Sequence, residues 1–439
     1  MSTIPNSFAT PSAVSPGRTL VDDCFLLDQP RVTHARAIEV LRDRMAPVAG
    51  IEPVTLDNAA GRILAQETIA RRDIPAHTNS AVDGYAFAFS EPLTAGVVLP
   101  IAGRAAAGHA MPEPAQPGSA IRILTGAVVP AGLDTVVMQE DVEVVARDGA
   151  PHVRISAGAK RGANVRLAGE DVASGAQLFA PGHVLRPQDL AALASAGLDW
   201  VDCRARLRVG VFSTGDEVVR PGTPLGAGQV YDANAPMLAA LVATTGAVTQ
   251  DLGILPDDPA VVRQRLAEAA LRFDVLITSG GASRGEEDHV VRALDAIGKR
   301  HLWQIAIKPG RPMSFGQIGN CVFIGLPGNP VAVFVCFLLY AWPMLRCLGG
   351  APWPEPRALQ LPSLTAITKK TGRREYWRGI LRTEGGRLMV EKFDRDGSGL
   401  ITSLRVADGL IEAGEDVGAI AAGEPVTFIP FTEYGIPRL

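Results

Sequence analysis

The sequence has few cysteines and none at a spacing typical of a metal site. Five cysteines occur in 439 residues, and no two of them are separated as Cys-x-x-Cys. A disulfide framework uses an even number of cysteines, and a zinc site uses closely spaced pairs. The cysteines are therefore predicted to be ordinary buried thiols, in a protein that fits the reducing cytoplasm.

An excess of basic residues and a membrane segment are also missing. Lys and Arg number 42 against 46 Asp and Glu, a formal net charge of −4, which argues against general nucleic-acid binding. The most apolar run, residues 331–345, is about five residues shorter than the roughly 20 that span a bilayer. We expect a buried helix there, no membrane contact, and partners that are small molecules or proteins.

The length of the chain exceeds what one ordinary hydrophobic core supports. At about 150 residues per domain, this length predicts roughly three domains. Residues 1–17 are polar and proline-rich and lack the features of a signal peptide, so we expect a disordered lead-in. Apolar residues at helical spacing predict helices at 33–45, with Thr33 as the cap, and at 57–66. A polar loop at 74–85 then marks the start of a new module.

That module is predicted to be small and all-β. Residues 99–145 are rich in glycine, proline and β-forming residues, with candidate strands at 120–124 and 134–137. Thr125 follows the first of these strands, at a position where a turn is a commoner role than a ligand contact. Residues 187–197 then predict a helix with a glycine near its C-cap.

An α/β unit is predicted from residue 207 to about 349. Strands and helices alternate there, which indicates a parallel sheet with right-handed crossovers and helices at 235–245 and 259–272. Asp257 and Asp258 precede the second helix, so either could serve only as its cap. Beyond a proline cluster, strand-like segments between glycines predict a separate C-terminal β domain of about 80 residues.

The segment with the most chemical content is 273–290, FDVLITSGGASRGEEDHV. Its apolar start predicts a buried parallel strand, and the glycines after it could offer backbone N–H groups to a phosphate. Three acidic residues close the segment, and carboxylates beside a phosphate call for a divalent cation such as Mg²⁺ between them. The alternative is a glycine turn followed by a helix whose acidic first turn complements the helix dipole.

Two other strand ends repeat this arrangement. Residues 207–217, LRVGVFSTGDE, end in Asp216 and Glu217, and residues 321–330, CVFIGLPGNP, end in a glycine turn. Parallel α/β sheets bind ligands at the carboxyl ends of their strands, so the three ends are predicted to line one crevice. Lys308 and Arg311 flank a Pro-Gly turn and suit the binding of an oxyanion.

Seven motifs together resemble the molybdopterin molybdenumtransferase family, which includes MoeA and a domain of animal gephyrin. No single motif is specific, but the ordered set covers nearly the whole chain beyond the lead-in. The motifs are NSAVDGYA at 79–86, RILTGAVVP at 122–130, STGDE at 213–217, YDAN at 231–234, SGGASRGEED at 279–288, IKPGRPMSFG at 307–316 and GLPGNPVAV at 325–333.

The resemblance implies an enzyme that uses Mg²⁺ to insert molybdate into adenylylated molybdopterin, releasing AMP and forming the molybdenum cofactor. It implies a multidomain subunit of the α/β plus β class, in a homodimer with a shared active site. Other cofactor-biosynthesis proteins and apo-molybdoenzymes are the expected protein partners. The implied domains are a lead-in at 1–20, an elongated discontinuous N-terminal domain at 21–77 and 164–206, an inserted β domain at 78–163, a central α/β parallel-sheet molybdopterin-binding domain at 207–352 and a C-terminal β barrel at 357–439.

The matching motifs also imply the functional residues. The catalytic residues would be Asp83, Thr125, Glu217, Asp257 and Asp288, of which Glu217, Asp257 and Asp288 would bind Mg²⁺. The substrate-binding residues would be Thr214, Gly215, Asp216, Ser279, Gly280, Gly281, Ser283, Lys308, Arg311, Pro327, Gly328, Asn329 and Pro330. The chain departs from the usual family residues at Thr78, Val82, Ala282, Arg284 and Ala332.

Two other functions use the same features. A scaffold protein of the same fold would have no need of the acidic residues. A Mg²⁺-dependent nucleotide phosphohydrolase would release phosphate from ordinary nucleoside triphosphates without a pterin.

Overall fold

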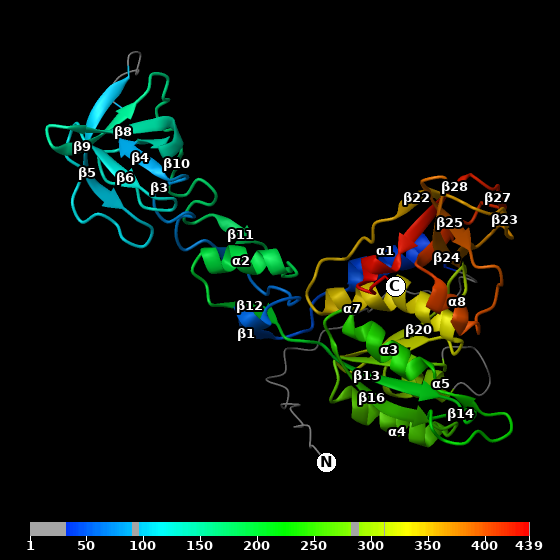
Figure 1. The fold of residues 1–439 in the computed structure, drawn as a ribbon. Coiled ribbons are helices and arrows are strands. Elements are labelled where there is room, and N and C mark those ends of the chain that lie inside the picture. The colour runs from blue at the N-terminus through cyan, green and yellow to red at the C-terminus, as the bar shows by residue number, and fades with distance from the viewer. Residues whose placement is uncertain (1–31, 90–95, 282–288, 311, 439) are drawn as a thin grey trace.

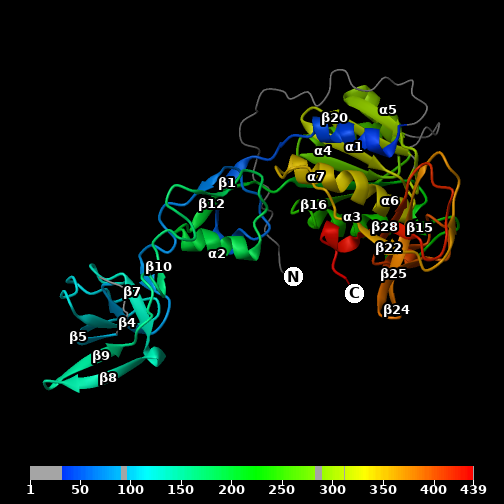
Figure 2. The same cartoon turned by 90° about the horizontal axis from the view of Figure 1, so that it is seen from above.

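Three six-stranded sheets organise the described part of the chain, each in a different region of an elongated molecule (Figure 1). The structure is a computed structural model that describes residues 32–89, 96–281, 289–310 and 312–438. A β module lies at one end, a slender region built around β1, β12 and α2 connects it, and the other two sheets form the larger body (Figures 1 and 2).

The central sheet has the strand order β16-β13-β17-β21-β20-β18. The first four strands are parallel, as predicted, but β20 pairs antiparallel with both β21 and β18, so the sheet is not parallel throughout. The physical reason is the short turn between β20 and β21, since two strands joined so closely can only form a hairpin. The strands are β13 (Arg208–Thr214), β16 (Val248–Leu255), β17 (Val275–Ser279), β18 (Lys299–Gln304), β20 (Pro312–Ile318) and β21 (Cys321–Leu326).

Helices cover this sheet close to where the sequence predicts them. Asp258 is the cap of α4: its Oδ1 accepts hydrogen bonds from the backbone N–H groups of Ala260 and Val261 at 2.8 and 3.0 Å. Asp257 is therefore not the cap. The helices are α3 (Asn234–Ala243), α4 (Pro259–Ala270), α5 (His289–Ile297), α6 (Pro330–Cys336), a π-helical segment (Phe337–Ala341) and α7 (Trp342–Leu348), and a short strand pair, β14 (Val218–Val219) with β15 (Val230–Tyr231), follows β13.

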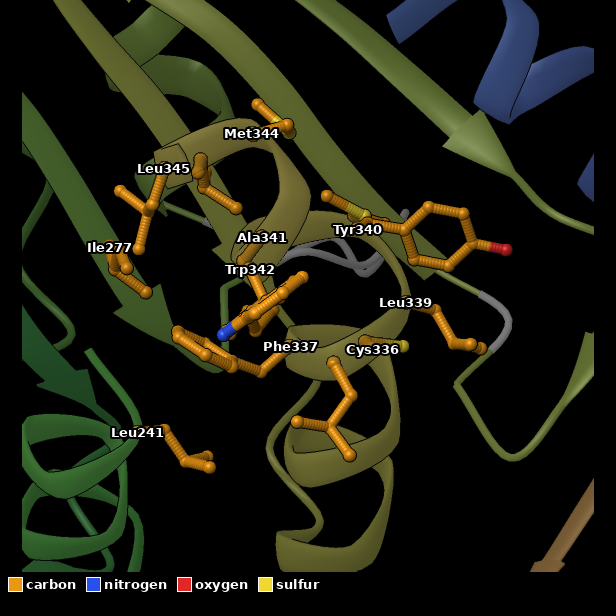
Figure 3. Close-up of a cluster of buried hydrophobic side chains, with 14 of the residues drawn as sticks. Leu241, Ile277, Cys336, Phe337, Leu339, Tyr340, Ala341, Trp342, Met344 and Leu345 are labelled. Carbon is orange, nitrogen blue, oxygen red and sulfur yellow. The ribbon is translucent and has the colours of Figure 1, made fainter. Parts of the chain in front are cut away.

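The apolar run forms one continuous helix in the core, as predicted. The stretch Pro330–Leu348 has 19 residues, so it is long and apolar enough to cross a membrane, but 94% of its most apolar window is buried inside the molecule. Figure 3 shows Phe337 and Trp342 on the side of the helix toward Leu241 of α3 and Ile277 of β17, with Leu339 and Tyr340 on the opposite side. Tyr376 and Phe431 of the C-terminal region belong to the same core cluster.

The N-terminal region contains one predicted helix and lacks another. Helix α1 (His34–Arg44) begins after Thr33, whose hydroxyl accepts the Arg36 N–H as predicted. The predicted helix at 57–66 is wrong, because only a 3-10 turn (Leu56–Asn58) forms before Gly61, at φ +74°. The N–H groups of Gly61 and Leu64 donate to the carbonyl oxygens of Leu185 and His183, and that of Ala65 donates to Asp202, so long-range bonds replace a helix.

The rest of this region consists of short strand pairs around the predicted helix α2 (Pro187–Ser195). Because the paired strands come from both sides of the β module in the sequence, the chain passes through this region twice. The pairs are β1 (Ile51–Thr55) with β12 (Trp200–Arg204), β2 (Thr68–Ile69) with β11 (Gln177–Phe179) and β3 (Asn79–Ser80) with β10 (Val165–Arg166).

The β module has the strand order β7-β4-β6-β5-β9-β8. Its strands β6 (Ala120–Ile123) and β7 (Thr135–Met138) confirm the two candidate strands. The others are β4 (Gly84–Phe87), β5 (Val97–Ala105), β8 (Val142–Arg147) and β9 (Ala150–Ile155).

The C-terminal sheet confirms the strands predicted there, but it is not separate from the α/β body. Strand β19 (Ile307–Lys308) comes from the α/β stretch and pairs in parallel with β24 (Arg374–Glu384). Its other elements are β22 (Leu359–Pro362), β25 (Arg387–Lys392), β26 (Gly409–Ala413), β28 (Pro425–Pro430), the pair β23 (Ile367–Thr368) with β27 (Ala419–Ile420), and α8 (Ile401–Val406). The domain boundaries given above stay predictions.

Candidate functional site

The three polar strand ends lie side by side, as the sequence predicts. Strand β17 lies between β13 and β21, with Ser279 in register with both Ser213 and Leu326. Each strand is followed by one of the loops that carry the predicted site. The carboxyl edge of the sheet therefore brings together residues separated by more than a hundred positions in the chain.

Asn234 at the start of α3 joins two of these loops. Its Nδ2 donates to the Ser279 Oγ at 2.6 Å and to the Gly328 carbonyl oxygen at 2.7 Å, whereas its buried Oδ1 has no hydrogen-bond partner among the described residues. The hydroxyl of Thr214 donates to the Ser279 carbonyl oxygen at 3.2 Å. Ser279 and Thr214 thus stabilise the loops from within. Asn234 belongs to the YDAN motif, which was the only sequence signal for its role.

The glycine loop is only partly available to a phosphate. Gly280 and Gly281 have φ values of +89° and +67°, and a Cβ on Gly280 would overlap the Thr214 hydroxyl, so only glycine fits there. The Gly280 N–H donates to the Leu326 carbonyl oxygen at 3.0 Å. The predicted use of this amide as a free phosphate donor therefore does not fit the structure, whereas Gly281 keeps that role as a prediction.

A cavity of about 580 Å³ opens beside this loop. Its volume is that of a small-molecule site. One wall is formed by predicted residues of the α/β body, and the other by residues of the C-terminal sheet that the sequence did not indicate. The lining residues are Gly280, Gly281, Lys308, Pro309, Gly310, Pro327, Gly328, Asn329, Ala332, Tyr376, Trp377, Arg378, Asp396, Gly397 and Ser398.

Two cations and a carboxylate face this cavity. The Lys308 Nζ lies 3.6 Å from the Glu375 Oε2 and 3.9 Å from the Asp396 Oδ2. Burial would raise the pKa of Asp396, but the hydrogen bond from Lys392 and the nearby positive charges lower it overall, so Asp396 is ionised near neutral pH.

Arg378 is the charge most clearly built into the wall. It is only 4% exposed, and its guanidinium donates to the Ser403 Oγ at 3.0 Å and to the Arg395 carbonyl oxygen at 3.2 Å. Burial lowers its pKa, an effect that the charge of Asp396 opposes. The guanidinium remains charged, because its ordinary pKa is far above neutrality. Both of these acceptors are neutral, so an anion in the cavity would complement the guanidinium.

The acidic residues after β13 and β16 form a second part of the site, on the surface. The Asp257 N–H donates to the Asp216 Oδ1 at 3.0 Å, and the Asp216 N–H lies 3.4 Å from the Asp257 Oδ2. The Glu217 carboxylate folds over Gly215, where a Cβ would overlap it. Among the described residues no group of three or more potential ligands is close enough to hold a metal ion.

The predicted residues Asp83 and Thr125 contact each other in the β module. The Asp83 Oδ1 accepts hydrogen bonds from the Thr125 N–H and hydroxyl, both at 2.7 Å. These two bonds lower the pKa of Asp83, so the carboxylate is ionised at neutral pH. Figures 1 and 2 show this module at the opposite end of the molecule from the sheet that carries the cavity. The predicted residues Ser283, Asp288 and Arg311 lie outside the described residues.

Family models match three successive parts of the chain. Residues 32–197 match the MoeA N-terminal region (domain I and II), residues 210–347 a probable molybdopterin binding domain, and residues 360–431 the MoeA C-terminal region (domain IV). A Haemophilus influenzae protein named molybdopterin molybdenumtransferase is 38% identical over 382 residues, which cover 87% of this chain and 94% of that protein.

The chain belongs to the molybdopterin molybdenumtransferase family. A Mycobacterium tuberculosis member, molybdopterin molybdenumtransferase 2, is 34% identical over 400 residues, 89% of this chain and 96% of that protein. The crystal structure of the molybdopterin biosynthesis MoeA protein from Pyrococcus horikoshii superposes with a TM-score of 0.77 at 30% identity, covering 91% of this chain and 99% of that one. These family members therefore share the multidomain fold with its α/β and β-rich parts.

Proposed function

We propose that this protein takes part in molybdenum cofactor biosynthesis by inserting molybdate into adenylylated molybdopterin, with release of AMP. The observation that carries the proposal is the cavity, in which a glycine loop, a Pro-Gly-Asn turn, Lys308 and the buried Arg378 meet. A tetrahedral oxyanion would complement these two cations. Curated relatives that match most of the chain carry the same activity in their names.

The adenylylated pterin would bind along the carboxyl edge of the sheet. The Gly281 amide and the turn of Pro327, Gly328 and Asn329 line the cavity wall nearest the strand ends, where α/β sheets hold phosphate-bearing ligands. Tyr376 and Trp377 line the opposite wall, but at 1% and 3% exposure their rings pack into the hydrophobic cores behind it. Asn234 holds the two phosphate-side loops together and so fixes the spacing between them.

A bound Mg²⁺ fits the chemistry of the residues beside the cavity. Glu217, Asp257 and Asp288 would hold it, and the first two offer exposed carboxylate oxygens, the ligands that Mg²⁺ prefers. The ion would neutralise negative charge on the phosphates of the substrate. The Asp216 side chain, through its bond to the Asp257 N–H, orients the loop that carries one of these ligands.

The position of Asp83 and Thr125 favours a homodimer with a shared site. Within one chain these residues lie in the module farthest from the cavity (Figure 1). If both parts serve one reaction, the β module of one subunit must approach the cavity of another, as a twofold dimer allows. We accordingly propose that the protein is a cytoplasmic homodimer. Its protein partners would be other cofactor-biosynthesis proteins and the apo-molybdoenzymes that receive the cofactor.

The test is reconstitution of an apo-molybdoenzyme with adenylylated molybdopterin, molybdate, Mg²⁺ and this protein. AMP release and enzyme activation should both depend on molybdate. Lys308→Ala should raise the molybdate concentration for half-maximal insertion about tenfold, since a charge-assisted hydrogen bond contributes about 1.5–3 kcal/mol, and Arg311→Ala should act in the same direction.

Lys370→Ala is the matched control, because Lys370 is an exposed lysine of the same C-terminal region that does not line the cavity. Activation without any need for this protein would contradict the proposal. So would phosphate release from ordinary nucleoside triphosphates as the sole activity, which would indicate a phosphohydrolase.

A further inference from the structure

The edge of the β module that carries Asp83 and Thr125 also carries two arginines. Arg104 on β5 and Arg122 on β6 are direct register partners on neighbouring parallel strands. Each stands one residue before its strand ends, and Thr125 follows the end of β6, while Asp83 immediately precedes β4. Register partners point to the same face of a sheet. The two side chains therefore leave the same face of the sheet from neighbouring positions at this edge.

Arg122 is held in place by the module itself. Its guanidinium carbon lies 5.1 Å from the centre of the Tyr85 ring, its Nη1 donates to the Gly84 carbonyl oxygen at 3.1 Å, and its Nη2 donates to the Gln139 side chain. The backbone N–H of Gln139 in turn donates to the Asp83 carbonyl oxygen at 3.1 Å. Arg122 is thus tied into the same edge as Asp83.

The Arg104 side chain, in contrast, is exposed and makes no hydrogen bond or ion pair with any described residue. Arg122 likewise has no carboxylate within ion-pair distance among the described residues, although its charge helps to lower the pKa of the neighbouring Asp83. Like charges directly opposite each other destabilise a sheet. Two arginines kept in register, neither of them within ion-pair distance of a described carboxylate, are the arrangement that an anionic ligand would stabilise.

We infer that Arg104 and Arg122 form a binding site for a phosphate group of the substrate, presented by the cavity of a second copy of this chain. The inference rests on the proposed function and deepens it. Paired guanidinium groups bind phosphate oxygens through parallel, charge-assisted hydrogen bonds. The ligand class is a phosphate ester or anhydride of the kind found in adenylylated molybdopterin, for which AMP is an accessible probe. Asp83 and Thr125 then stand next to the bound phosphate.

Arg104 is the residue to substitute, because its side chain makes no hydrogen bond or ion pair with the described residues and its replacement should not disturb the fold. Arg104→Gln should raise the KM for adenylylated molybdopterin about tenfold, equivalent to about 1.4 kcal/mol, and leave the molybdate dependence unchanged. Arg104→Lys keeps the charge and should recover part of the loss. Arg147→Gln, at the far end of the β8–β9 hairpin, removes a charge from the same module and should change nothing.

Calorimetric titration of the intact protein with AMP separates this inference from the proposed function. Arg104→Gln should weaken AMP binding about tenfold relative to wild type and to Arg147→Gln, the same free-energy loss as above. Equal AMP affinity and equal KM in all three proteins would overturn the inference and leave the proposed function standing. If the wild type inserts no molybdate, the proposed function fails, and AMP titration still decides whether the arginines bind phosphate.

Discussion

The balance of charges decides how the cavity can hold an anion. Lys308 and Arg378 provide two cations, and Glu375 and Asp396 lie within 4 Å of the lysine. Each of these carboxylates also pairs with a second cation at 2.8 Å. Neither carboxylate therefore depends on Lys308 alone. The cavity can accept an oxyanion without leaving a carboxylate unpaired, which a buried site requires.

Which single residues could be predicted depended on how far away their partners lie in the sequence. The caps Thr33 and Asp258 each bond to an N–H two or three residues on, so local patterns predict them. Asn234 and Arg378 act through partners 94 and 25 positions away. Only the folded chain brings those partners together, and for this reason neither residue appeared among the predicted site residues.

We predict that protonation of His34 lowers the free energy of unfolding measurably as the pH falls. His34 contacts the Tyr340 hydroxyl at 2.9 Å, and burial, followed by the charge of Arg374, lowers its pKa from 6.5 to about 4 against an opposing effect of Glu415. The folded state therefore holds His34 neutral at pH values where the unfolded chain protonates it. Its contribution is complete above pH 6.5 and is lost as the pH falls towards 4, at most about 3 kcal/mol.

The measurement is the urea midpoint of unfolding between pH 7 and pH 4.5, for wild type and His34→Gln. The variant should lose less stability than the wild type over this range, because it has no imidazole to titrate. His152→Gln is the control, since His152 is a partly exposed histidine of the β module, outside the core that holds His34. Parallel pH profiles for all three proteins would show that His34 does not govern the acid response.

The elements of the α/β body were predicted better than those of the linking region. Buried runs such as Val275–Ile277 and the periodic helix α4 carry strong signals, because a whole face of each packs against the core. The segment 57–66 has helical composition, but its Gly61 and Leu64 N–H groups bond to Leu185 and His183, far along the chain. Long-range pairing overrode local propensity there, just as the hairpin of β20 and β21 overrode the expected parallel order.

The buried helix Pro330–Leu348 supports the turn that carries Lys308. The Cys336 Sγ donates to the Gly310 carbonyl oxygen at 3.4 Å, in the last turn before the π-helical segment. Gly310 has φ +100°, and a Cβ on it would overlap the Cys336 sulfur. The turn is therefore packed directly onto the helix, and Lys308 takes its position from that contact.

Gly310→Ala should consequently affect both stability and function. Overpacking at this contact is expected to cost about 1–3 kcal/mol, and displacement of the turn should raise the molybdate concentration for half-maximal insertion. Gly319→Ala is the matched control, since Gly319 also has a positive φ but has open space around its Cβ position. Unfolding midpoints and molybdate titrations are the two readouts.

A second substitution identifies the cause. Cys336→Ala removes the sulfur that the new methyl group would meet, so the Gly310→Ala/Cys336→Ala protein should regain part of the lost molybdate affinity. If Gly310→Ala behaves like Gly319→Ala, or if the double variant is no better than Gly310→Ala, contact with the helix does not position Lys308.

In the molecule as a whole, the two halves of the predicted site lie in different modules. The cavity is built from the α/β body and the C-terminal sheet, whereas Asp83 and Thr125 belong to the β module at the other end (Figure 2). The sequence motifs indicated residues in both halves of the site, but they gave no information on the distance between the two halves. Because the molecule is elongated, the two halves of the predicted site can form one active site only if they come from different subunits.

Subunit exchange tests the shared site. Mixing Asp83→Ala and Asp288→Ala proteins should produce heterodimers with one site that carries both lesions and one that carries neither, by the symmetry of a twofold dimer. Activity should recover to at most about half of the wild-type value per heterodimer. Verified heterodimers that stay as inactive as both parents would show that Asp83 acts within its own chain or only on structure.

The same mixture locates Arg104. The intact site of the heterodimer combines the β module of the Asp288→Ala chain with the cavity of the Asp83→Ala chain. Arg104→Gln added to the Asp288→Ala chain should therefore raise the KM of the recovered activity, whereas the same substitution on the Asp83→Ala chain should leave it unchanged. Equal effects from both placements would mean that Arg104 does not reach the partner's cavity. A reversed pattern would mean that it serves the cavity of its own chain.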